Sequence, residues 1–234
     1  MSDPAPRAHP GFGLRAVSVR REQRTVLTGI DVELTEHRIG VIGLNGSGKS
    51  TLVRLLNGLL LPTTGTVTWN GLDTRREAKR VRRAVGFVFQ NPDNQIVMPL
   101  VGEDVAFGVR NLGLPRAEVP VRVRAALDRF GLGDLHDREA HTLSGGEKQL
   151  LALAGVLIME PEVVVFDEPT TLLDLRNVRR LGAEIAALDQ QVIMVSHDLD
   201  ALAGFDRVLR VEDGRVVDDG PADAVITGYR RRWG

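Results

Sequence analysis

The sequence predicts an α/β fold with a mostly parallel core sheet, and three observations lead to this prediction. An apolar, strand-like stretch at residues 39–44 runs into a glycine-rich loop and then into a helix-like segment at 50–56. The uninterrupted apolar run Val163–Phe166 is typical of a strand buried on both faces of a parallel sheet. Strand-like and helix-like segments alternate again from Glu162 onward. Alternation of this kind favours a parallel sheet covered by helices.

The other elements are expected to add an antiparallel edge and a helical subdomain. Strand-like stretches at residues 14–19, 25–34 and 66–69 alternate as an antiparallel edge does, and residues 73–83 form a basic helical stretch. Three helix-like stretches lie at residues 101–110, 115–130 and 144–159, so the interval from about 91 to 160 is expected to be mostly helical. A strand at 191–194, a hairpin at 206–218 and a short helix at 221–227 follow. We expect residues 1–13 to be a flexible leader and residues 14–234 to form one domain.

Composition excludes several classes of protein. The chain has 234 residues, and its 43% of hydrophobic residues suffices for a buried core. The net charge of −1 gives no electrostatic case for a nucleic-acid partner, so none is expected. Because the chain has no cysteine, disulfides and thiolate metal sites are excluded. The longest apolar run, residues 150–159, is about half of the ~20 residues that a membrane-spanning helix needs.

The glycine-rich loop predicts the binding of a nucleoside triphosphate. Its glycines allow unusual backbone dihedral angles and let N–H groups approach phosphate oxygens at a helix N-terminus. Lys49 would place its charge on the β- and γ-phosphates, Ser50 would offer a hydroxyl to Mg²⁺, and Thr51 would support the phosphates. The nucleotide-binding residues predicted here are Gly43, Leu44, Asn45, Gly46, Ser47, Gly48, Lys49, Ser50 and Thr51.

Two acids follow the apolar run at 163–166. Asp167 would lie at the carboxyl end of a buried strand, where open α/β sheets bind their ligands, and would hold Mg²⁺ directly or through water. Glu168 is the candidate general base for the water that attacks the γ-phosphate. Taken without the loop upstream, the same pair could be two solvated acids in a turn before Pro169.

The segment Ser144-Gly145-Gly146-Glu147 is a further candidate functional motif. It fits a helix capping box, with Ser144 as N-cap and Glu147 three residues later. A capping box does not explain two glycines in a first helical turn, which are useful where a phosphate approaches. Residues 143–149 resemble the signature of ATP-binding cassette (ABC) ATPases, with Glu147 where glutamine is usual.

Other positions resemble this family in the same order along the chain. Gln90 resembles the Q-loop glutamine, Asp174 the D-loop aspartate and His197 the switch histidine. The resemblance, from residue 14 to about 220, implies that residues 91–160 form a helical subdomain inserted in the nucleotide-binding core. The same resemblance implies that Gln90 and His197 sense the γ-phosphate and that Gln90 helps to hold Mg²⁺. It also implies an ATP-hydrolysing homodimer, in which Ser144, Gly145, Gly146 and Glu147 of one chain cover the ATP of the other. Residues 17–21, where the family usually places an aromatic residue that stacks on adenine, contain none.

The segment after Gln90 is more specific. Residues 90–97, 103–108 and 111–115 resemble the ATPases of energy-coupling factor (ECF) transporters, which energise the uptake of vitamins and metal ions. The resemblance implies a peripheral subunit at the cytoplasmic face of the cell membrane, bound to a transmembrane scaffold and a substrate-binding membrane subunit. Asp93, Glu103 and Asp104 are candidate acidic contacts to scaffold arginines, and the alternative for each is a helix cap or an exposed acid without a partner. Within the family the chain is most similar to ATPases of biotin importers. The alternatives are cobalt, nickel or another vitamin as cargo, or a soluble ABC ATPase of an assembly scaffold.

Overall fold

The computed structural model describes residues 11–109 and 112–233. The chain divides into two compact units, the first made of the chain up to Arg82 and from Asp189 onward, the second of Arg83–Leu188. Most of the predicted leader lies outside the described residues, and strand β1 begins at Phe12, inside the predicted leader range.

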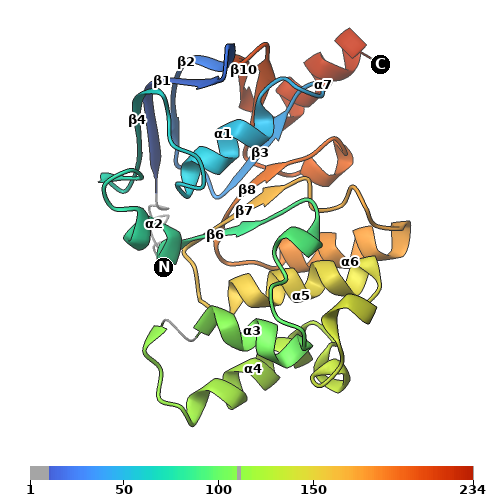
Figure 1. Ribbon diagram of the computed structural model, residues 1–234. Helices are drawn as coiled ribbons and strands as arrows, with labels where there is room; N and C mark the ends of the chain where they lie inside the picture. The colour runs from blue at the N-terminus through green and yellow to red at the C-terminus, as the bar shows by residue number, and fades with distance from the viewer. Residues whose placement is uncertain (1–10, 110–111, 234) are drawn as a thin grey trace, which may run out of the picture. The chain divides into compact units, whose positions relative to one another are not determined.

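The first unit contains a four-stranded antiparallel sheet in the order β2-β1-β4-β5 (Figure 1). Its strands are β1 (Phe12–Arg21), β2 (Arg24–Leu34), β4 (Thr64–Trp69) and β5 (Leu72–Asp73). Leu14, Val17 and Val19 of β1 are buried, whereas polar residues between them are more exposed, as expected for a strand with one face on the core. The sheet confirms the antiparallel edge predicted from the alternation.

A second group of strands in the first unit carries the glycine-rich loop. Strand β3 (Arg38–Ile42) lies between β8 (Gln191–Val195) and β9 (Arg207–Glu212) and is parallel to both. Strand β10 (Arg215–Pro221) pairs antiparallel with β9, which confirms the predicted hairpin. All five residues of β8 are buried, which explains the apolar run from Val192 to Val195 that follows Gln191. Helix α1 (Lys49–Leu56) follows the loop, and helix α7 (Ala222–Trp233) packs on β9 and β10.

The second unit contains a parallel strand pair and the helical subdomain (Figure 1). Strand β6 (Val85–Val88) pairs with β7 (Val163–Asp167), so that Val88 lies opposite Phe166. Helix α5 (Gly145–Leu157) packs against β6 and against helices α3 (Val101–Val109) and α4 (Glu118–Arg129). Helix α6 (Leu175–Ala186) and the one-turn 3₁₀ helix η1 (Pro92–Asn94) belong to the same unit. Parallel pairs with helices around them confirm the predicted α/β class.

Helices α2 and α7 differ most from the expected bounds. Helix α2 is Ala78–Ala84, which begins five residues later than the basic stretch predicted at 73–83. The delay arises because the Asp73 carboxylate accepts hydrogen bonds from the backbone N–H of Arg75 and Arg76, a local turn that competes with a helix. Helix α7 runs to Trp233, beyond the predicted end at 227. Within the described part of the chain, no helix combines the length and the apolar character of a membrane span.

Candidate nucleotide site

The glycine-rich loop of the first unit is folded around the ammonium group of Lys49. This side chain is only 4% exposed, and its Nζ donates hydrogen bonds to the carbonyls of Gly43 (2.9 Å) and Leu44 (3.0 Å). The Ser47 hydroxyl is buried in the same loop, and no group in the described part of the chain forms a hydrogen bond with it. A buried cation and an orphaned hydroxyl in one backbone loop fit the oxygen atoms of a phosphate group.

The turn between β9 and β10 braces this loop from outside. Gly214 donates its N–H to the Ser47 carbonyl (3.0 Å) and accepts the N–H of Thr28 at its own carbonyl (2.9 Å). Nearby, a Cβ on Gly43 would lie 2.1 Å from the Val211 carbonyl oxygen, and the φ of Gly43 is +146°. Only glycine therefore fits at position 43. The sequence predicted the Asp213-Gly214 turn, but nothing in it indicated this long-range contact.

The other predicted residues of the first unit lie at the same edge of the parallel strands. Strands β3 and β8 are parallel with Val41 opposite Val195, and Ser196 donates its N–H to the Val41 carbonyl (3.3 Å). The loop follows β3 and His197 follows β8, so parallel pairing places both at the carboxyl ends of neighbouring strands. Helix α1 has Gly48 at its N-cap and no side-chain cap, which leaves first-turn N–H groups for a ligand.

The second unit brings Gln90 and Glu168 together. Gln90 Nε2 donates a long hydrogen bond to Glu168 Oε2 (3.4 Å), and Thr171 Oγ1 donates to the same oxygen (3.3 Å). Glu168 has a φ of +53°, a left-handed conformation that is rare and costly for residues with a side chain. Asp167, the last residue of β7, is 1% exposed. Sequence analysis did not foresee Thr171 as a partner of Glu168.

The signature segment forms a complete capping box. Ser144 donates its backbone N–H and its hydroxyl to Glu147 Oε2 (2.8 Å each), and its Oγ accepts the N–H of Glu147 (3.3 Å). These bonds lower the pKa of Glu147: the Ser144 backbone N–H contributes most, and the Ser144 hydroxyl adds to it. The predicted capping box is confirmed.

Gly146 and the predicted D-loop residue Asp174 meet the same side chain. A Cβ on Gly146 would lie 2.3 Å from Cγ of Asn177, so close packing also requires glycine at this position. Asp174 is the N-cap of α6: it accepts the backbone N–H of Asn177 (2.9 Å) and its side-chain Nδ2 (3.0 Å). By contrast, the nearest atom to a Cβ on Gly145 is the Leu172 carbonyl oxygen at 3.7 Å, an ordinary van der Waals contact, so packing within the chain does not require glycine at this position. Sequence analysis missed Asn177, which joins the signature to the D-loop.

We expect the Glu147→Gln substitution to reduce the acid sensitivity of the fold. Because folding lowers the pKa of Glu147, its ionised form stabilises the protein above the ordinary carboxyl pKa, and that contribution is lost as pH falls through the folded-state pKa. Glutamine keeps the acceptor of the capping box but does not titrate there. Thermal unfolding followed between pH 7 and pH 3 should show a larger loss of Tm in the wild type than in the variant. Equal slopes would contradict this assignment.

The three acids proposed to meet a scaffold occupy different environments. Asp93 is exposed and forms an ion pair with Lys148 (2.7 Å), and Glu103 is exposed on α3. Asp104 is 8% exposed, and its Oδ1 accepts the N–H groups of Val97 (2.8 Å) and Met98 (3.0 Å). The expectation that Asp104 meets a partner is therefore wrong, because its carboxylate caps the turn at 97–98.

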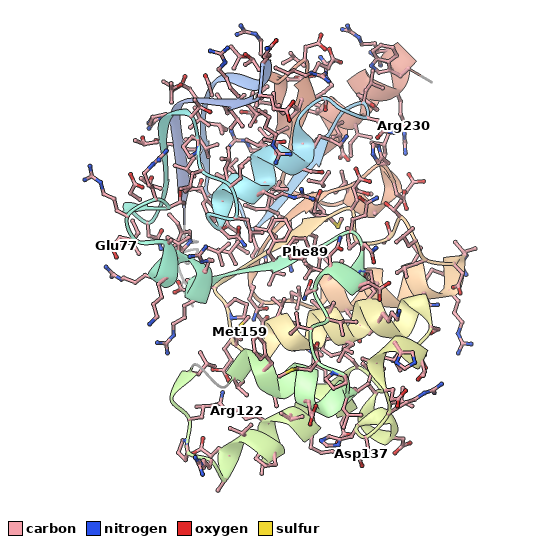
Figure 2. All side chains as sticks on the ribbon, in the orientation of Figure 1. Glu77, Phe89, Arg122, Asp137, Met159 and Arg230 are labelled. Carbon is pink, nitrogen blue, oxygen red and sulfur yellow. The ribbon has the colours of Figure 1, made fainter. Side chains whose placement is uncertain are left out.

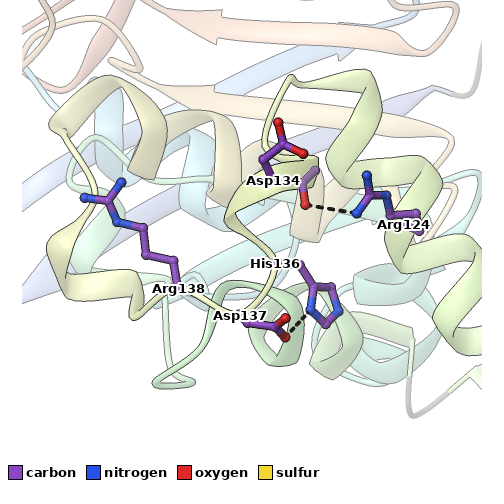
Figure 3. Close-up of a pocket in the computed structure, with 6 residues that line it drawn as sticks. Arg124, Asp134, His136, Asp137 and Arg138 are labelled. Atoms are coloured by element: carbon purple, nitrogen blue, oxygen red, sulfur yellow. Dashed lines mark hydrogen bonds and ion pairs between the residues drawn. The ribbon is translucent and has the colours of Figure 1, made fainter.

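Two hollows lie in the second unit. The first, of 350 Å³, is here called the η1 groove and is lined by Asp93, Ile96, Val97, Met98, Pro99, Ala140 and His141. The second, of 560 Å³, is shown in Figure 3 and is lined by Arg124, Gly133, Asp134, His136, Asp137 and Arg138. In the second, Arg124 donates to the Gly133 carbonyl (3.2 Å) and His136 Nδ1 lies 2.6 Å from Asp137 Oδ1. None of the predicted nucleotide-site residues lines either hollow.

Comparison with known proteins adds independent information. Residues 27–171 match the family model described as ABC transporter. The chain is 50% identical over 207 residues to the biotin transport ATP-binding protein BioM of Rhizobium etli, covering 88% of this chain and 92% of that protein. It is 48% identical over 203 residues to the energy-coupling factor transporter ATP-binding protein EcfA1 of Symbiobacterium thermophilum, covering 82% and 70%. A solved structure of cbiO1 from Clostridium perfringens, part of the transporter complex cbiONQ, aligns with a TM-score of 0.81 at 33% identity, covering 94% of this chain and 92% of that one.

Proposed function

The chain belongs to the ABC transporter family of ATP-binding proteins, and on that premise we propose that it is the energy-coupling ATPase of an ECF-type importer for biotin. The observation that carries the importer assignment is the η1 groove. Most of its lining residues lie between 93 and 99, shortly after Gln90 in the chain, and one of them, Asp93, is acidic. A transmembrane scaffold seated there would contact the segment that adjoins Gln90. Together with a substrate-binding membrane subunit, such a scaffold would hold this chain at the cytoplasmic face of the membrane, where ATP is available.

Each unit supplies a separate part of the ATPase chemistry. In the first unit, Lys49 and the backbone N–H groups of the loop bind the phosphates, and the Ser47 hydroxyl gains the partner that it lacks. Ser50, Asp167 and Gln90 offer hydroxyl, carboxylate and amide oxygens, the donor types that Mg²⁺ prefers. Bound Mg²⁺ supplies charge neutralisation at the phosphates.

In the second unit, Glu168 is the general base that takes a proton from the attacking water. Gln90 and Thr171 fix the direction of its carboxylate through their hydrogen bonds to Oε2. His197 of the first unit serves as a sensor of the γ-phosphate. Ser144, Gly145, Gly146 and Glu147 of a second copy cover the ATP, and packing within the chain does not explain the glycine at position 145. Function therefore requires a homodimer that encloses ATP, with Asp174 beside the signature of its own chain.

Biotin as the cargo rests on similarity to BioM alone, since an ATPase subunit does not touch the transported molecule. The sequence left cobalt, nickel or another vitamin open, and EcfA1 names no cargo. Expressing the chain with the membrane subunits encoded beside it and measuring uptake of labelled biotin, Co²⁺ and Ni²⁺ decides among them. ATP-dependent biotin uptake supports the proposal. Uptake of a metal ion but not of biotin would contradict biotin as the cargo and would still support an importer.

The rival function is a soluble ABC ATPase that serves an assembly scaffold. It predicts a stable complex with soluble proteins and no membrane subunit. Affinity purification from detergent-solubilised membranes and from the soluble fraction, followed by mass spectrometry, distinguishes the two. Recovery with soluble partners only would sink the importer assignment.

We expect reversal of Glu103 to lysine to weaken assembly with the membrane subunits without affecting nucleotide binding. Exposed carboxylates meet scaffold arginines as charge-assisted pairs, and Glu103 lies outside the glycine-rich loop. The loss should be about tenfold in assembly affinity, or ~1.4 kcal/mol. Co-purification of the membrane subunits is measured beside ATP binding by the purified variant. Full assembly with the variant contradicts the contact.

Asp93 needs a matched control because it already pairs with Lys148. The Asp93→Lys reversal breaks this ion pair as well as reversing the charge at the groove. The double variant Asp93→Lys, Lys148→Asp restores an internal pair of opposite charges but keeps the reversed charge at position 93. If the scaffold binds the negative charge of Asp93, the double variant remains defective in assembly. If the internal pair is what matters, it assembles normally.

A further inference from the structure

Phe89, which is labelled in Figure 2, is the residue that follows β6, and two glutamine side chains hold its backbone. Phe89 donates its N–H to Gln95 Oε1 (3.2 Å), and its carbonyl accepts a hydrogen bond from Gln149 Nε2 (3.2 Å). Gln95 Nε2 in turn donates to the carbonyl of Ala152 in α5 (2.7 Å). The backbone groups of Phe89 are therefore bonded to side chains where the strand pairing of β6 has ended. We call Gln95 and Gln149 the glutamine clamp.

The clamp depends on the amide group in particular. Gln95 uses its oxygen to accept and its nitrogen to donate, so it joins Phe89 to α5 in one bridge. A carboxylate could accept only, and an apolar side chain could do neither. Gln149 is 1% exposed, and water cannot readily replace its bond to Phe89.

The residue that the clamp holds is the chain neighbour of Gln90. Gln90 Nε2 reaches Glu168 Oε2 over 3.4 Å, at the long end of hydrogen-bond geometry. A small displacement of the backbone at Phe89 would break this bond. The Phe89 ring also packs on Phe87 of β6, with ring centroids 4.8 Å apart, which fixes the same residue from its side chain. The clamp thus holds the backbone of the residue that precedes Gln90.

The clamp also joins this segment to the helix that begins at the signature. Three residues of α5 bind the chain after β6: Lys148 pairs with Asp93, Gln149 with Phe89, and Ala152 with Gln95. They lie within little more than one turn, on one side of the helix. The same helix begins with the Ser144 capping box. A shift of α5 must therefore carry the backbone next to Gln90 with it.

We propose that Gln95 and Gln149 are positioning residues for ATP hydrolysis. They set Gln90 against Glu168 and make the movement of the signature helix and the movement of Gln90 a single event. The proposal rests on the function proposed above, because it takes Gln90 and Glu168 as working partners. Neither clamp residue contacts Glu168 in the hydrogen bonds described, so both act through Gln90.

The test is a double-mutant cycle between Gln95→Met and Gln90→Ala in the purified chain. Methionine keeps the length of glutamine and removes its amide. We expect Gln95→Met to lower kcat for ATP hydrolysis by about tenfold and to change KM for ATP by less than about twofold. In the Gln90→Ala background the same substitution should have no further effect, because its target is gone. Gln149→Met should behave in the same way as Gln95→Met.

The matched control is Asn94→Leu, which removes an exposed amide from the adjacent position and should leave kcat unchanged. Thermal unfolding is measured for every variant, and if buried Gln149→Met does not fold, Gln95→Met decides alone. Normal kcat in Gln95→Met, or an equal loss of kcat in both backgrounds, overturns the clamp while the proposed function stands. A wild type without ATPase activity, or Gln90→Ala with full activity, overturns the proposed function and the clamp with it.

Discussion

Glu168→Gln should bind ATP with near wild-type affinity and lose hydrolysis by about 10²–10⁴-fold, the usual contribution of a general base. The glutamine oxygen can still accept the hydrogen bond from Thr171, so the local structure is retained. Without a base, the attacking water is not deprotonated, and the ATP-bound dimer accumulates. Single-turnover hydrolysis, equilibrium ATP binding and size-exclusion chromatography with ATP measure these three outcomes. Turnover at the wild-type rate would refute the role of Glu168.

The chain offers a matched control for this substitution. Glu160 also adopts a left-handed backbone, with a φ of +52° against +53° for Glu168. It lies in the same unit, is exposed, and pairs with Arg122 (2.9 Å). Glu160→Gln therefore repeats the chemical change on the same backbone conformation away from the proposed site. Its hydrolysis rate should match the wild type, and a loss there would trace the effect to the backbone rather than to base catalysis.

Mixing two inactive variants should restore hydrolysis, because we place Lys49 and Ser144 on opposite chains of each ATP site. Lys49→Ala removes the phosphate-binding charge, and Ser144→Arg blocks the signature. Random exchange between equal amounts makes half of the dimers mixed, each with one intact site, so activity should reach at most about a quarter of the wild type. Steady-state ATPase activity is measured before and after subunit exchange, which is followed by energy transfer between labelled chains.

Ser144→Arg also removes the N-cap of α5, which costs about 1 kcal/mol and could act through stability. Thr142→Arg is the control: it adds the same side chain two residues earlier, at an exposed position outside the capping box. This variant should remain active. If the two inactive variants exchange subunits and the mixture stays inactive, the site is not shared between chains.

The sequence predicted elements best where one physical signal was strong. Strand β7 matches the apolar run and its terminal acid, since a strand buried on both faces admits no polar interruption. Helix α7 was predicted too short because its last turn is basic and carries no apolar periodicity. That turn is held by ion pairs from Arg230 to Asp200 and from Arg232 to Glu212, which only the fold brings together.

In the candidate site, too, residues within a local motif are predictable from the sequence, whereas contacts between distant segments are not. Motif spacing predicts Lys49, Gln90, Glu168 and Ser144 as site residues, because the chemistry of phosphate binding restricts the residue types near one another in the chain. The contacts that support these residues could not be predicted, because they join segments that are distant in the sequence. Asn177 of the next helix packs on Gly146, and nothing in the sequence indicates that these two residues are in contact. The sequence does not show that Asp104 is buried, because its burial depends on the backbone turn at 97–98.

On the ribosome, the glycine-rich loop emerges long before the turn that braces it. Gly214 supplies the N–H for the Ser47 carbonyl and the carbonyl for the Thr28 N–H, yet it belongs to the last hairpin of the chain. At about 5–20 residues per second, translation leaves the loop unbraced for on the order of ten to thirty seconds. Throughout that interval the nascent chain lacks the backbone contacts that shape its phosphate cradle. We therefore expect the loop to bind nucleotide only near the end of synthesis. A product truncated before the hairpin contains the complete loop motif without the backbone contacts that hold it.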